Sequence, residues 1–372
     1  MTDAAELLVV VGARPNFVKV APVLTALNQH SEVRARVLHT GQHYDRSMSG
    51  AFLDQLEFPD PQFQLGVGSG SHAHQTAAVL VGVERVLSAE SFDAVLVAGD
   101  VNSTLAAALA ASKLGVAVIH LESGLRSGDW TMPEEINRVL TDRLSALLLI
   151  HSAEAIANLA AEGIAADRVV LVGNTMIDSL FSLLPAARAS GALARHELEP
   201  QGYVLVTLHR PALVDDPTRL AAVVEVLADL AEAIPVVFPM HPRTHARLGV
   251  HHAHLLQQIR GLPPLDYLEF IELEAQARLV ITDSGGVQEE TTALGVPCLT
   301  YRTTTERPVT VDLGTNELVG LDPNVLRARC ADLVAEPWQP KPCSIPFWDG
   351  HAGDRAAGAV TGFLTRPRIA AG

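Results

Sequence analysis

The chain has 372 residues, of which 48% are hydrophobic and 19% carry a charge. These proportions are typical of a globular protein, and the length exceeds the usual size of a single hydrophobic core, so we expect two domains. A net charge of −15 argues against attraction to nucleic acid or anionic lipid, and no apolar run could span a bilayer, which favours a cytoplasmic protein that binds neither.

Apolar runs alternate with helical stretches along the chain and predict buried strands. In the first half these runs lie at residues 7–11, 33–38, 94–98, 116–119 and 147–150. The rhythm restarts after residue 200, with runs at 203–207, 236–239, 279–282 and 297–300. Such alternation predicts an α/β fold with doubly wound parallel sheets. Two series of strands predict two Rossmann-like domains that face a cleft.

The composition also suggests where the domains begin and end. Small and polar residues at 186–202 precede a fresh strand, so we place the first domain at residues 1–190 and the second at 191–345. A proline-rich segment at 337–350 leads into a last helix from about residue 351 to 364. We expect residues 346–372 to cross back and to pack on the first domain.

Polar side chains follow the predicted strands of the first half. Ligands of open α/β sheets bind beyond the carboxyl ends of the strands, so these residues are the candidates: Arg14, Lys19, Gln42, His43, Asp100, His120, Glu122, Arg126 and Asp129. The next helix opens at Pro133 and carries Glu134 and Arg138 on one face, with Glu135 turned away by about 100°. This half therefore offers carboxylates for acid–base chemistry.

The second half places cations and glycine turns at the corresponding positions, namely His209, Arg210, His241, Arg243, Arg302 and Arg307. The stretch "TDSGGVQEETTALGVP" at 282–297 predicts a strand end, a tight turn at 283–286 and a helix at 287–294 that stops at Gly295. The bare N–H groups and the positive dipole of such a helix start attract anions. The second half is therefore predicted to bind a diphosphate.

Each of these residues also has a purely structural interpretation. Asp283 is at first sight a helix cap, Arg14 a solvated cation in a loop, and Glu134 a complement to the helix dipole. His120 is either a hydrogen-bonded core histidine or a substrate contact. Independent caps would not gather carboxylates in one half and guanidinium groups in the other, which favours the functional interpretation.

Eight motifs together resemble the non-hydrolysing UDP-N-acetylglucosamine 2-epimerase family: "GARPNFVKVAP", "AGDVNST", "HLESGLRSGD", "MPEEINRVLTD", "VGNTMIDSL", "TLHRP", "DSGGVQEE" and "TTERP". The resemblance runs from about residue 7 to residue 366. It implies a two-domain fold like that of GT-B glycosyltransferases, a homodimer, no cofactor, and interconversion of UDP-GlcNAc and UDP-ManNAc. The implied reaction eliminates UDP to leave a 2-acetamidoglucal, then adds UDP back with C2 inverted. Polysaccharide biosynthesis is the expected setting, while a teichoic linkage unit and a secondary metabolite stay open as the pathway served.

The resemblance also implies roles for residues of this chain. Asp100, Glu122 and Glu134 match the catalytic carboxylates, and His209 matches the catalytic histidine. Residues implied to contact UDP or the sugar are Arg14, Lys19, Gln42, Arg138, Arg210, His241, Ser284, Gly285, Gly286, Glu290 and Arg307. Glu290 lies six residues beyond Ser284, about 9 Å along a helix, which suits the ribose hydroxyls if the glycine turn holds phosphate. Glu289 is expected to serve structure or solvent, and no metal site is expected.

Departures from the best-known members leave alternatives open. This chain has His209-Arg210-Pro211-Ala212 where they carry "HRRE", and it differs again at residues 42–46, so a second, regulatory UDP-GlcNAc site stays open. The pattern resembles a branch that acts on modified sugars, among them UDP-2,3-diacetamido-glucuronate and UDP-6-deoxy-L-hexosamines. A hydrolysing epimerase that releases ManNAc, a GT-B glycosyltransferase and a non-catalytic sugar-nucleotide sensor are further alternatives. The clustered carboxylates favour an epimerase.

Overall fold

The chain folds into two compact units in the computed structural model, which describes residues 4–41, 55–240, 242–248, 257–336, 339 and 341–366. Unit 1 comprises Met1–Ser179 with Pro346–Gly372, and unit 2 comprises Leu180–Ile345. The first division lies within helix α7 (Thr175–Ala189), earlier than the polar stretch at 186–202. The start of α7 is tied to unit 1, because the Ser179 hydroxyl donates to the Val18 carbonyl over 2.6 Å. The change in composition therefore marks the end of this helix rather than the division itself.

Unit 1 is built on a seven-stranded parallel sheet with the order β3-β2-β1-β4-β5-β6-β7. Its strands are β1 (Ala5–Val11), β2 (Val33–His39), β3 (Phe63–Gln64), β4 (Ala94–Ala98), β5 (Ala117–Leu121), β6 (Leu147–Ile150) and β7 (Val169–Leu171). The strands that the apolar runs predict are confirmed, whereas β3 and β7 were not predicted. The strand order reverses at β1, between β2 and β4, and such a reversal is where doubly wound sheets bind ligands.

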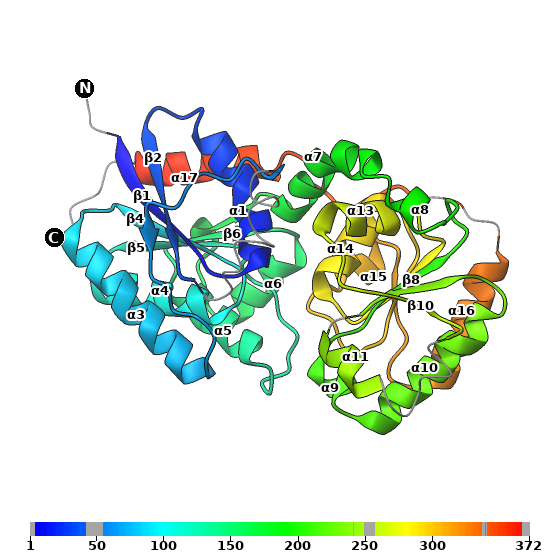
Figure 1. Cartoon of the computed structure of the whole chain (residues 1–372). Helices are drawn as coiled ribbons and strands as arrows, with labels where there is room; N and C mark the ends of the chain where they lie inside the picture. The colour runs from blue at the N-terminus through cyan, green and yellow to red at the C-terminus, as the bar shows by residue number, and fades with distance from the viewer. Residues whose placement is uncertain are drawn as a thin grey trace. The chain divides into compact units, whose positions relative to one another are not determined.

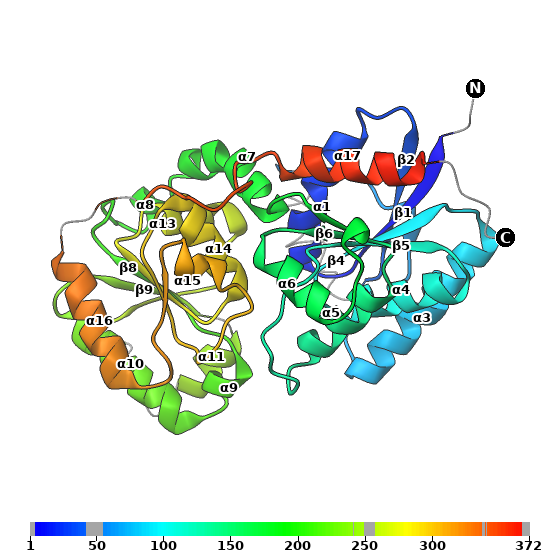
Figure 2. The same cartoon turned by 180° about the vertical axis from the view of Figure 1, so that it is seen from behind.

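Helices cover both faces of this sheet (Figures 1 and 2). They are α1 (Arg14–Leu27), α3 (His72–Ala89), α4 (Asn102–Lys113), α5 (Pro133–Leu144), α6 (Glu154–Ala161), the 3-10 turn η1 (Ala166–Arg168) and α17 (Ala352–Leu364). Helices α1 and α17 lie side by side on one face, and α3, α4 and α5 pack in a row on the other.

The C-terminal helix α17, red in Figure 1, belongs to unit 1. Its first turn is capped by the Asp178 carboxylate, which accepts the N–H groups of Ala352 and Gly353 over 3.1 and 2.7 Å. A Cβ atom on Gly353 would lie only 2.7 Å from the Pro22 carbonyl oxygen of α1. Glycine therefore permits the close approach of the two helices.

Unit 2 is built on a six-stranded parallel sheet with the order β10-β9-β8-β11-β12-β13. Its strands are β8 (Val204–Thr207), β9 (Val236–Pro239), β10 (Arg260–Leu262), β11 (Leu279–Thr282), β12 (Cys298–Thr300) and β13 (Asn316–Leu318). Its helices after α7 are α8 (Ala192–Arg195), α9 (Pro211–Val214), α10 (Pro217–Ala231), α11 (Pro242–Leu248), α13 (Tyr267–Ala275), α14 (Gly285–Leu294), α15 (Val309–Asp312) and α16 (Pro323–Ala335). Within the described ranges of both units, no helix has the length and apolar character needed to cross a membrane.

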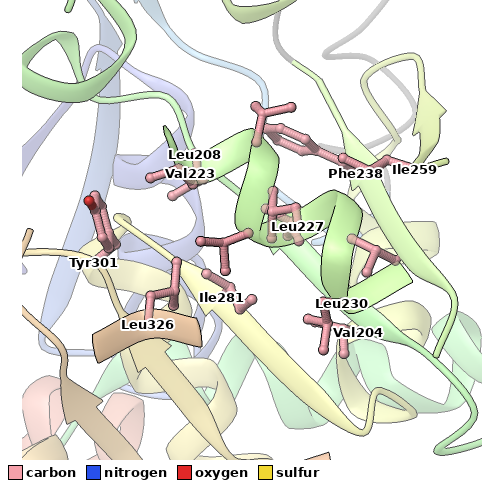
Figure 3. Packing of buried hydrophobic residues seen from close by; sticks show 14 of the residues in the cluster. Val204, Leu208, Val223, Leu227, Leu230, Phe238, Ile259, Ile281, Tyr301 and Leu326 are labelled. Carbon is pink, nitrogen blue, oxygen red and sulfur yellow. The ribbon is translucent and has the colours of Figure 1, made fainter. Parts of the chain in front are cut away.

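The core of unit 2 forms where α10 packs on its sheet (Figure 3). Val223, Leu227 and Leu230 recur at helical spacing on α10 and pack against strand residues such as Phe238 and Ile281. The N-terminus of α10 is capped by Asp216, which accepts the N–H groups of the first turn. Truncating one such buried leucine to alanine costs about 2–5 kcal/mol. This packing gives the strand ends of unit 2 a rigid base.

Candidate active site

A buried ion pair lies at the strand ends of unit 1. The Lys19 Nζ atom of α1 is 2.7 Å from the Glu122 carboxylate that follows β5, and both side chains are buried. Glu122 has φ of 65°, in the left-handed region that costs a residue with a side chain about 1–3 kcal/mol. A Cβ atom on Gly99 would lie 2.9 Å from Lys19 Nζ, so glycine after β4 leaves room for the ammonium group. The fold thus holds Glu122 in one orientation, and Lys19 joins it to the helix that follows β1, the strand at which the order reverses.

A second charged group joins Asp100, after β4, to helix α5. The Arg138 Nη2 atom lies 2.5 Å from Asp100 Oδ2, and Arg138 Nη1 contacts the Glu135 carboxylate. Glu135 also accepts the backbone N–H groups of Ser127 and Gly128, each over 3.0 Å. Burial alone would raise the pKa of Glu135, but these N–H donors and Arg138 together hold its pKa below the usual value. Arg138 thereby fixes the position of Asp100.

We expected Glu135 to be turned away from the helix face that Glu134 and Arg138 share, yet Arg138 contacts its carboxylate. Helical spacing does separate it from Glu134 by about 100°, but the loop that contains Ser127 and Gly128 closes over the face on which Glu135 lies. Glu135 is therefore buried, while Glu134 is half-buried in the first turn of α5. Helical periodicity alone could not predict that Glu135 is buried, because it does not show which loop covers that face of the helix.

His120 lies in the interior of unit 1. Its side chain is fully buried, its Nδ1 atom is 2.6 Å from Asp142 and its Nε2 atom is 2.8 Å from the Gly99 carbonyl oxygen. Arg126 also reaches Asp142, at 2.8 Å, and forms a second ion pair with Glu162. Both ring nitrogens of His120 are thus taken by protein groups, which supports its interpretation as a core histidine.

An open pocket of about 400 Å³ borders α3, α4 and α5 in unit 1. Its lining residues are His72, Ala73, Thr76, Ala77, Asn102, Pro133, Ile136 and Asn137. The Asn137 amide donates to the Asp100 carbonyl oxygen over 2.8 Å, so the pocket adjoins the Asp100 group.

In unit 2, Asp283 holds the loop that follows β8. Its buried carboxylate accepts the His209 N–H over 3.0 and 3.1 Å and the Arg210 N–H over 2.8 Å. The Nδ1 atom of His209 is also 3.1 Å from Asp283, while the imidazole stays half-exposed. The interpretation of Asp283 as a helix cap is wrong, because Ser284 occupies the N-cap position of α14. Strands β8 and β11 are neighbours, and that pairing is what brings Asp283 to His209.

Three arginines surround the buried carboxylate of Glu306. Arg307 Nη1 and Arg302 Nη2 lie 2.7 and 2.8 Å from its oxygens, and Arg210 Nη2 lies 3.6 Å away. Burial would raise the pKa of Glu306, but the three guanidinium groups outweigh burial and hold its pKa far below the usual range. Glu289, fully buried, lies 2.9 Å from Arg307 Nε, so it serves structure rather than solvent.

Helix α14 begins at Gly285, two residues before its predicted start at residue 287. The glycines suggested a turn, but Gly285 is already in the first turn of the helix, directly beside Arg307. A Cβ atom on Gly285 would lie 2.5 Å from Arg307 Nη1 and 2.8 Å from Glu306 Oε1. Glycine is therefore needed so that the guanidinium group can reach the helix N-terminus. Gly286 follows it in that turn.

The remaining candidates are spread over both units. Glu290 is buried on α14 and accepts the Tyr267 hydroxyl over 2.6 Å. Arg14 is the first residue of α1, and its side chain lies outside the part of the chain that the structure describes. Gln42 and His241 also lie outside the described residues.

We compared the chain with known protein families and proteins. The profile of the UDP-N-acetylglucosamine 2-epimerase family matches residues 25–361. The chain is 39% identical to the UDP-N-acetylglucosamine 2-epimerase of Methanocaldococcus jannaschii, over 96% of this chain and 99% of that protein. It is 43% identical to the UDP-2,3-diacetamido-2,3-dideoxy-D-glucuronate 2-epimerase of Pseudomonas aeruginosa, over 85% of this chain and 88% of that protein.

Solved structures extend the comparison to the fold. The crystal structure of the M. jannaschii enzyme in complex with UDP-GlcNAc and UDP matches with a TM-score of 0.86, over 96% of this chain and 99% of that one. A UDP-glucosyltransferase from Polygonum tinctorium, 14% identical, matches with a TM-score of 0.62 over 98% of this chain and 99% of that one and shares the fold alone, in keeping with the predicted GT-B-like class. The family profile and the identity over nearly the whole chain lead to one conclusion: this chain belongs to the UDP-N-acetylglucosamine 2-epimerase family.

Proposed function

We propose that the chain is a non-hydrolysing 2-epimerase that interconverts UDP-GlcNAc and UDP-ManNAc. The observation that carries this proposal is the buried Lys19–Glu122 pair, in which Glu122 has left-handed backbone. Strain of this kind persists only where the surrounding fold maintains it, and it concentrates at functional sites. The M. jannaschii relative, whose structure contains UDP-GlcNAc and UDP, makes this sugar nucleotide the first substrate to consider.

The chemistry needs both of the charged clusters described above. The C2 proton of the sugar is only weakly acidic, so it leaves as the C1–O bond breaks. A base takes the proton, the C2–H electrons form a C1=C2 double bond, and the C1–O electrons leave with UDP. Re-addition of UDP at C1, with a proton delivered to the opposite face of C2, completes the inversion. The enzyme must therefore stabilise an anionic leaving group and developing positive charge at C1, and must supply acid–base groups for both faces.

We assign the sugar chemistry to the carboxylates of unit 1. Asp100, Glu122 and Glu134 are the proposed acid–base and charge-stabilising groups, and His209 of unit 2 is the proposed catalytic histidine. Lys19 and Arg138 support this assignment, because each holds one of these carboxylates in place. Gln42 and Arg14 are proposed to contact UDP or the sugar because of the resemblance to the epimerase family.

We assign the nucleotide to unit 2. Ser284, Gly285 and Gly286 form the start of α14, where N–H groups and the helix dipole favour phosphate. Arg307 and Arg210 add guanidinium groups beside it, as their positions around Glu306 support. Glu290 is the proposed ribose contact, and His241 is a proposed contact by resemblance. Neither the elimination nor the re-addition transfers a hydride or an electron to an external acceptor, so the proposed route needs no redox cofactor.

A modified UDP-sugar is the second candidate substrate. The 43% identity to the P. aeruginosa 2-epimerase, over 85% of this chain, favours a 2,3-diacetamido-glucuronate in place of GlcNAc. The reaction type is the same for both, since the chemistry at C1 and C2 does not involve C3 or C6. A panel of UDP-sugars separates the two by comparison of kcat/KM.

The assembly and the setting are part of the proposal. We propose a homodimer that works in the cytoplasm and supplies polysaccharide biosynthesis. Two apolar side chains on α5, Ile136 and Leu140, are 40% and 46% exposed, which supports a protein contact on that helix. Light scattering of the purified chain measures its mass directly.

The deciding experiment is incubation with UDP-GlcNAc in D2O, followed by NMR. We expect UDP-ManNAc to appear and both epimers to carry deuterium at C2. Free ManNAc with UDP would instead identify a hydrolysing enzyme. A glycosyltransferase that lacks an acceptor, or a sensor, would return UDP-GlcNAc with hydrogen still at C2.

A further inference from the structure

Glu274, on α13, is a fully buried glutamate that the proposed reaction does not use. Among the residues that the structure describes, neither of its carboxylate oxygens has a hydrogen-bond partner. An ionised carboxylate in such a place would lose its hydration and gain no donor in return. The geometry therefore favours the neutral acid, which buries no net charge.

Among the described residues, the titratable groups that interact electrostatically with Glu274 are Glu290 from α14, Cys298 from β12 and Tyr203, which directly precedes β8. Glu272 lies on the same helix as Glu274 and also acts on Tyr203. Glu272 is engaged elsewhere, because it accepts the Ala192 N–H over 2.7 Å, and the Tyr203 hydroxyl donates to the Leu273 carbonyl oxygen. Burial, and then the charge of Glu290, raise the pKa of Glu274 well above its usual value.

Glu290 differs from Glu274 in having a donor. The Tyr267 hydroxyl, on the same helix as Glu274, donates to Glu290 Oε1 over 2.6 Å. A donated hydrogen bond stabilises the charged form of a carboxyl group, and two neighbouring buried carboxyl groups do not both ionise readily. The hydrogen bond from Tyr267 therefore favours the charged form at Glu290, and the lack of a donor favours the neutral form at Glu274.

We propose that Glu274 is a positioning residue: it holds a proton inside unit 2 and so keeps Glu290 a carboxylate that can accept the hydroxyl hydrogens of the nucleotide ribose. This inference rests on the proposed function, which puts the nucleotide of a UDP-sugar in unit 2. An ionised carboxylate is an acceptor at both oxygens, whereas a protonated one gives up part of that capacity. A neutral neighbour lets Glu290 use both oxygens on donors, the Tyr267 hydroxyl and the ribose.

The proposal predicts a pH dependence with a definite sign. As the pH rises, Glu274 ionises, two buried anions face each other, and the affinity for UDP falls. The ionisation of Glu274 also makes the free energy of unfolding depend on pH. The unfolded chain releases the proton near the ordinary glutamate pKa of about 4.3, whereas the folded chain keeps it to higher pH, so the free energy of unfolding falls as the pH rises between these two values. The stability due to Glu274 is therefore complete below the lower of these values and is lost progressively as the pH rises towards the folded pKa.

The test compares the wild type with Glu274→Gln, which keeps the shape and is neutral at every pH. Glu225→Gln, at an exposed position on α10, is the matched control for loss of one negative charge. Calorimetric titration with UDP from about pH 6 to pH 10 is the readout, because an ordinary glutamate does not titrate there. We expect Glu274→Gln to bind UDP within about threefold of the wild type at pH 6 and to lose less affinity at pH 10, by tenfold or more. The control should follow the wild type.

Two further measurements require neither UDP binding nor enzymatic activity, and the first of them requires only the wild type. Infrared difference spectra of the wild type should contain the carbonyl band of a protonated carboxylic acid at neutral pH, and the band should disappear in alkali. The Tm of Glu274→Gln should exceed that of the wild type at about pH 8, and the two should converge towards about pH 4.3. Absence of the carbonyl band overturns the proposal even if the variant fails to fold.

These outcomes separate the inference from the proposed function. If UDP does not bind the wild type, the proposed function fails, while the infrared band and the Tm still decide the state of Glu274. If UDP binds and Glu274→Gln keeps the pH dependence of the wild type, the inference is wrong and the proposed function stands.

Discussion

The two units use the same architecture but surround their strand ends with opposite charge. In unit 1, the described ion pairs join two cations, Lys19 and Arg138, to three carboxylates, Glu122, Asp100 and Glu135, so carboxylates are in excess among these pairs. In unit 2, the three arginines Arg210, Arg302 and Arg307 pair with two carboxylates, Glu306 and Glu289, so guanidinium groups are in excess among the described ion pairs. A parallel sheet provides the place for a site, and the side chains after each strand decide its chemistry.

The excess in each unit fits a different task. A carboxylate that shares its cation can still exchange a proton with a substrate, as a general base must. Glu306, in contrast, is held ionised by its arginines, so its role is to orient them. The guanidinium groups that it leaves incompletely neutralised are suited to a diphosphate. Changes confined to one unit should therefore separate turnover from nucleotide binding.

The largest effect is expected for Glu122→Gln. The substitution removes the charge that faces Lys19, and loss of a positioned acid–base group lowers kcat by about 10²–10⁴-fold. The affinity for UDP should stay within about threefold, since the nucleotide is assigned to unit 2. Steady-state kinetics and calorimetry measure the two, with Glu84→Gln, exposed on α3, as the control for charge. Full activity of Glu122→Gln would remove this residue from the catalytic set.

A smaller effect, of the opposite kind, is expected for Gly285→Ala. Its Cβ atom would lie 2.5 Å from Arg307 Nη1, so the guanidinium group must move away from the helix N-terminus. Loss of one charge-assisted hydrogen bond to phosphate weakens UDP binding by about 10- to 100-fold. KM for the UDP-sugar should rise more than kcat falls.

Gly358→Ala on α17 is the matched control for this substitution, because a Cβ atom there meets nothing within 4 Å. It should bind UDP as the wild type does. Equal affinities of the Gly285→Ala and Gly358→Ala variants would show that Arg307 does not depend on the glycine.

The smallest effect is expected for Glu135→Gln, which leaves Arg138 with Asp100 as its charged partner. The N–H donors of Ser127 and Gly128 then face a neutral amide, and the free energy of unfolding should fall by about 1–2 kcal/mol. The pKa of Glu135 is lowered in the folded chain, so its stabilising effect is present above the ordinary glutamate pKa of about 4.3 and is lost as the pH falls through the lowered value. The difference in Tm between variant and wild type should therefore narrow in acid.

Thermal unfolding from neutral pH down to about pH 2.5 measures this difference, because that range extends well below the ordinary glutamate pKa. Ser127→Ala is the companion variant, since it removes one hydroxyl donor to Glu135 and keeps the carboxylate. A difference in Tm that widens in acid would contradict the assignment of Glu135 as an ionised group.

The strands show which part of the fold the sequence could predict. Central strands of a parallel sheet are covered on both faces, so they appear as continuous apolar runs, and all of the predicted runs are strands. The strands that were not predicted are β3, β7, β10 and β13, and each lies at an edge of its sheet. They have two or three residues and are largely half-buried or exposed, so no apolar run marks them.

By itself, the sequence determined the two α/β units, the order of their central strands along the chain, and which polar residues follow those strands. These features depend on local periodicity and on short motifs. Only the tertiary structure decided the partners: Arg138 with Asp100, 38 residues apart, and Asp283 with His209, 74 residues apart. The physical reason is that crossover connections make distant strands into neighbours, and burial among those neighbours sets the charge state of a group such as Glu274.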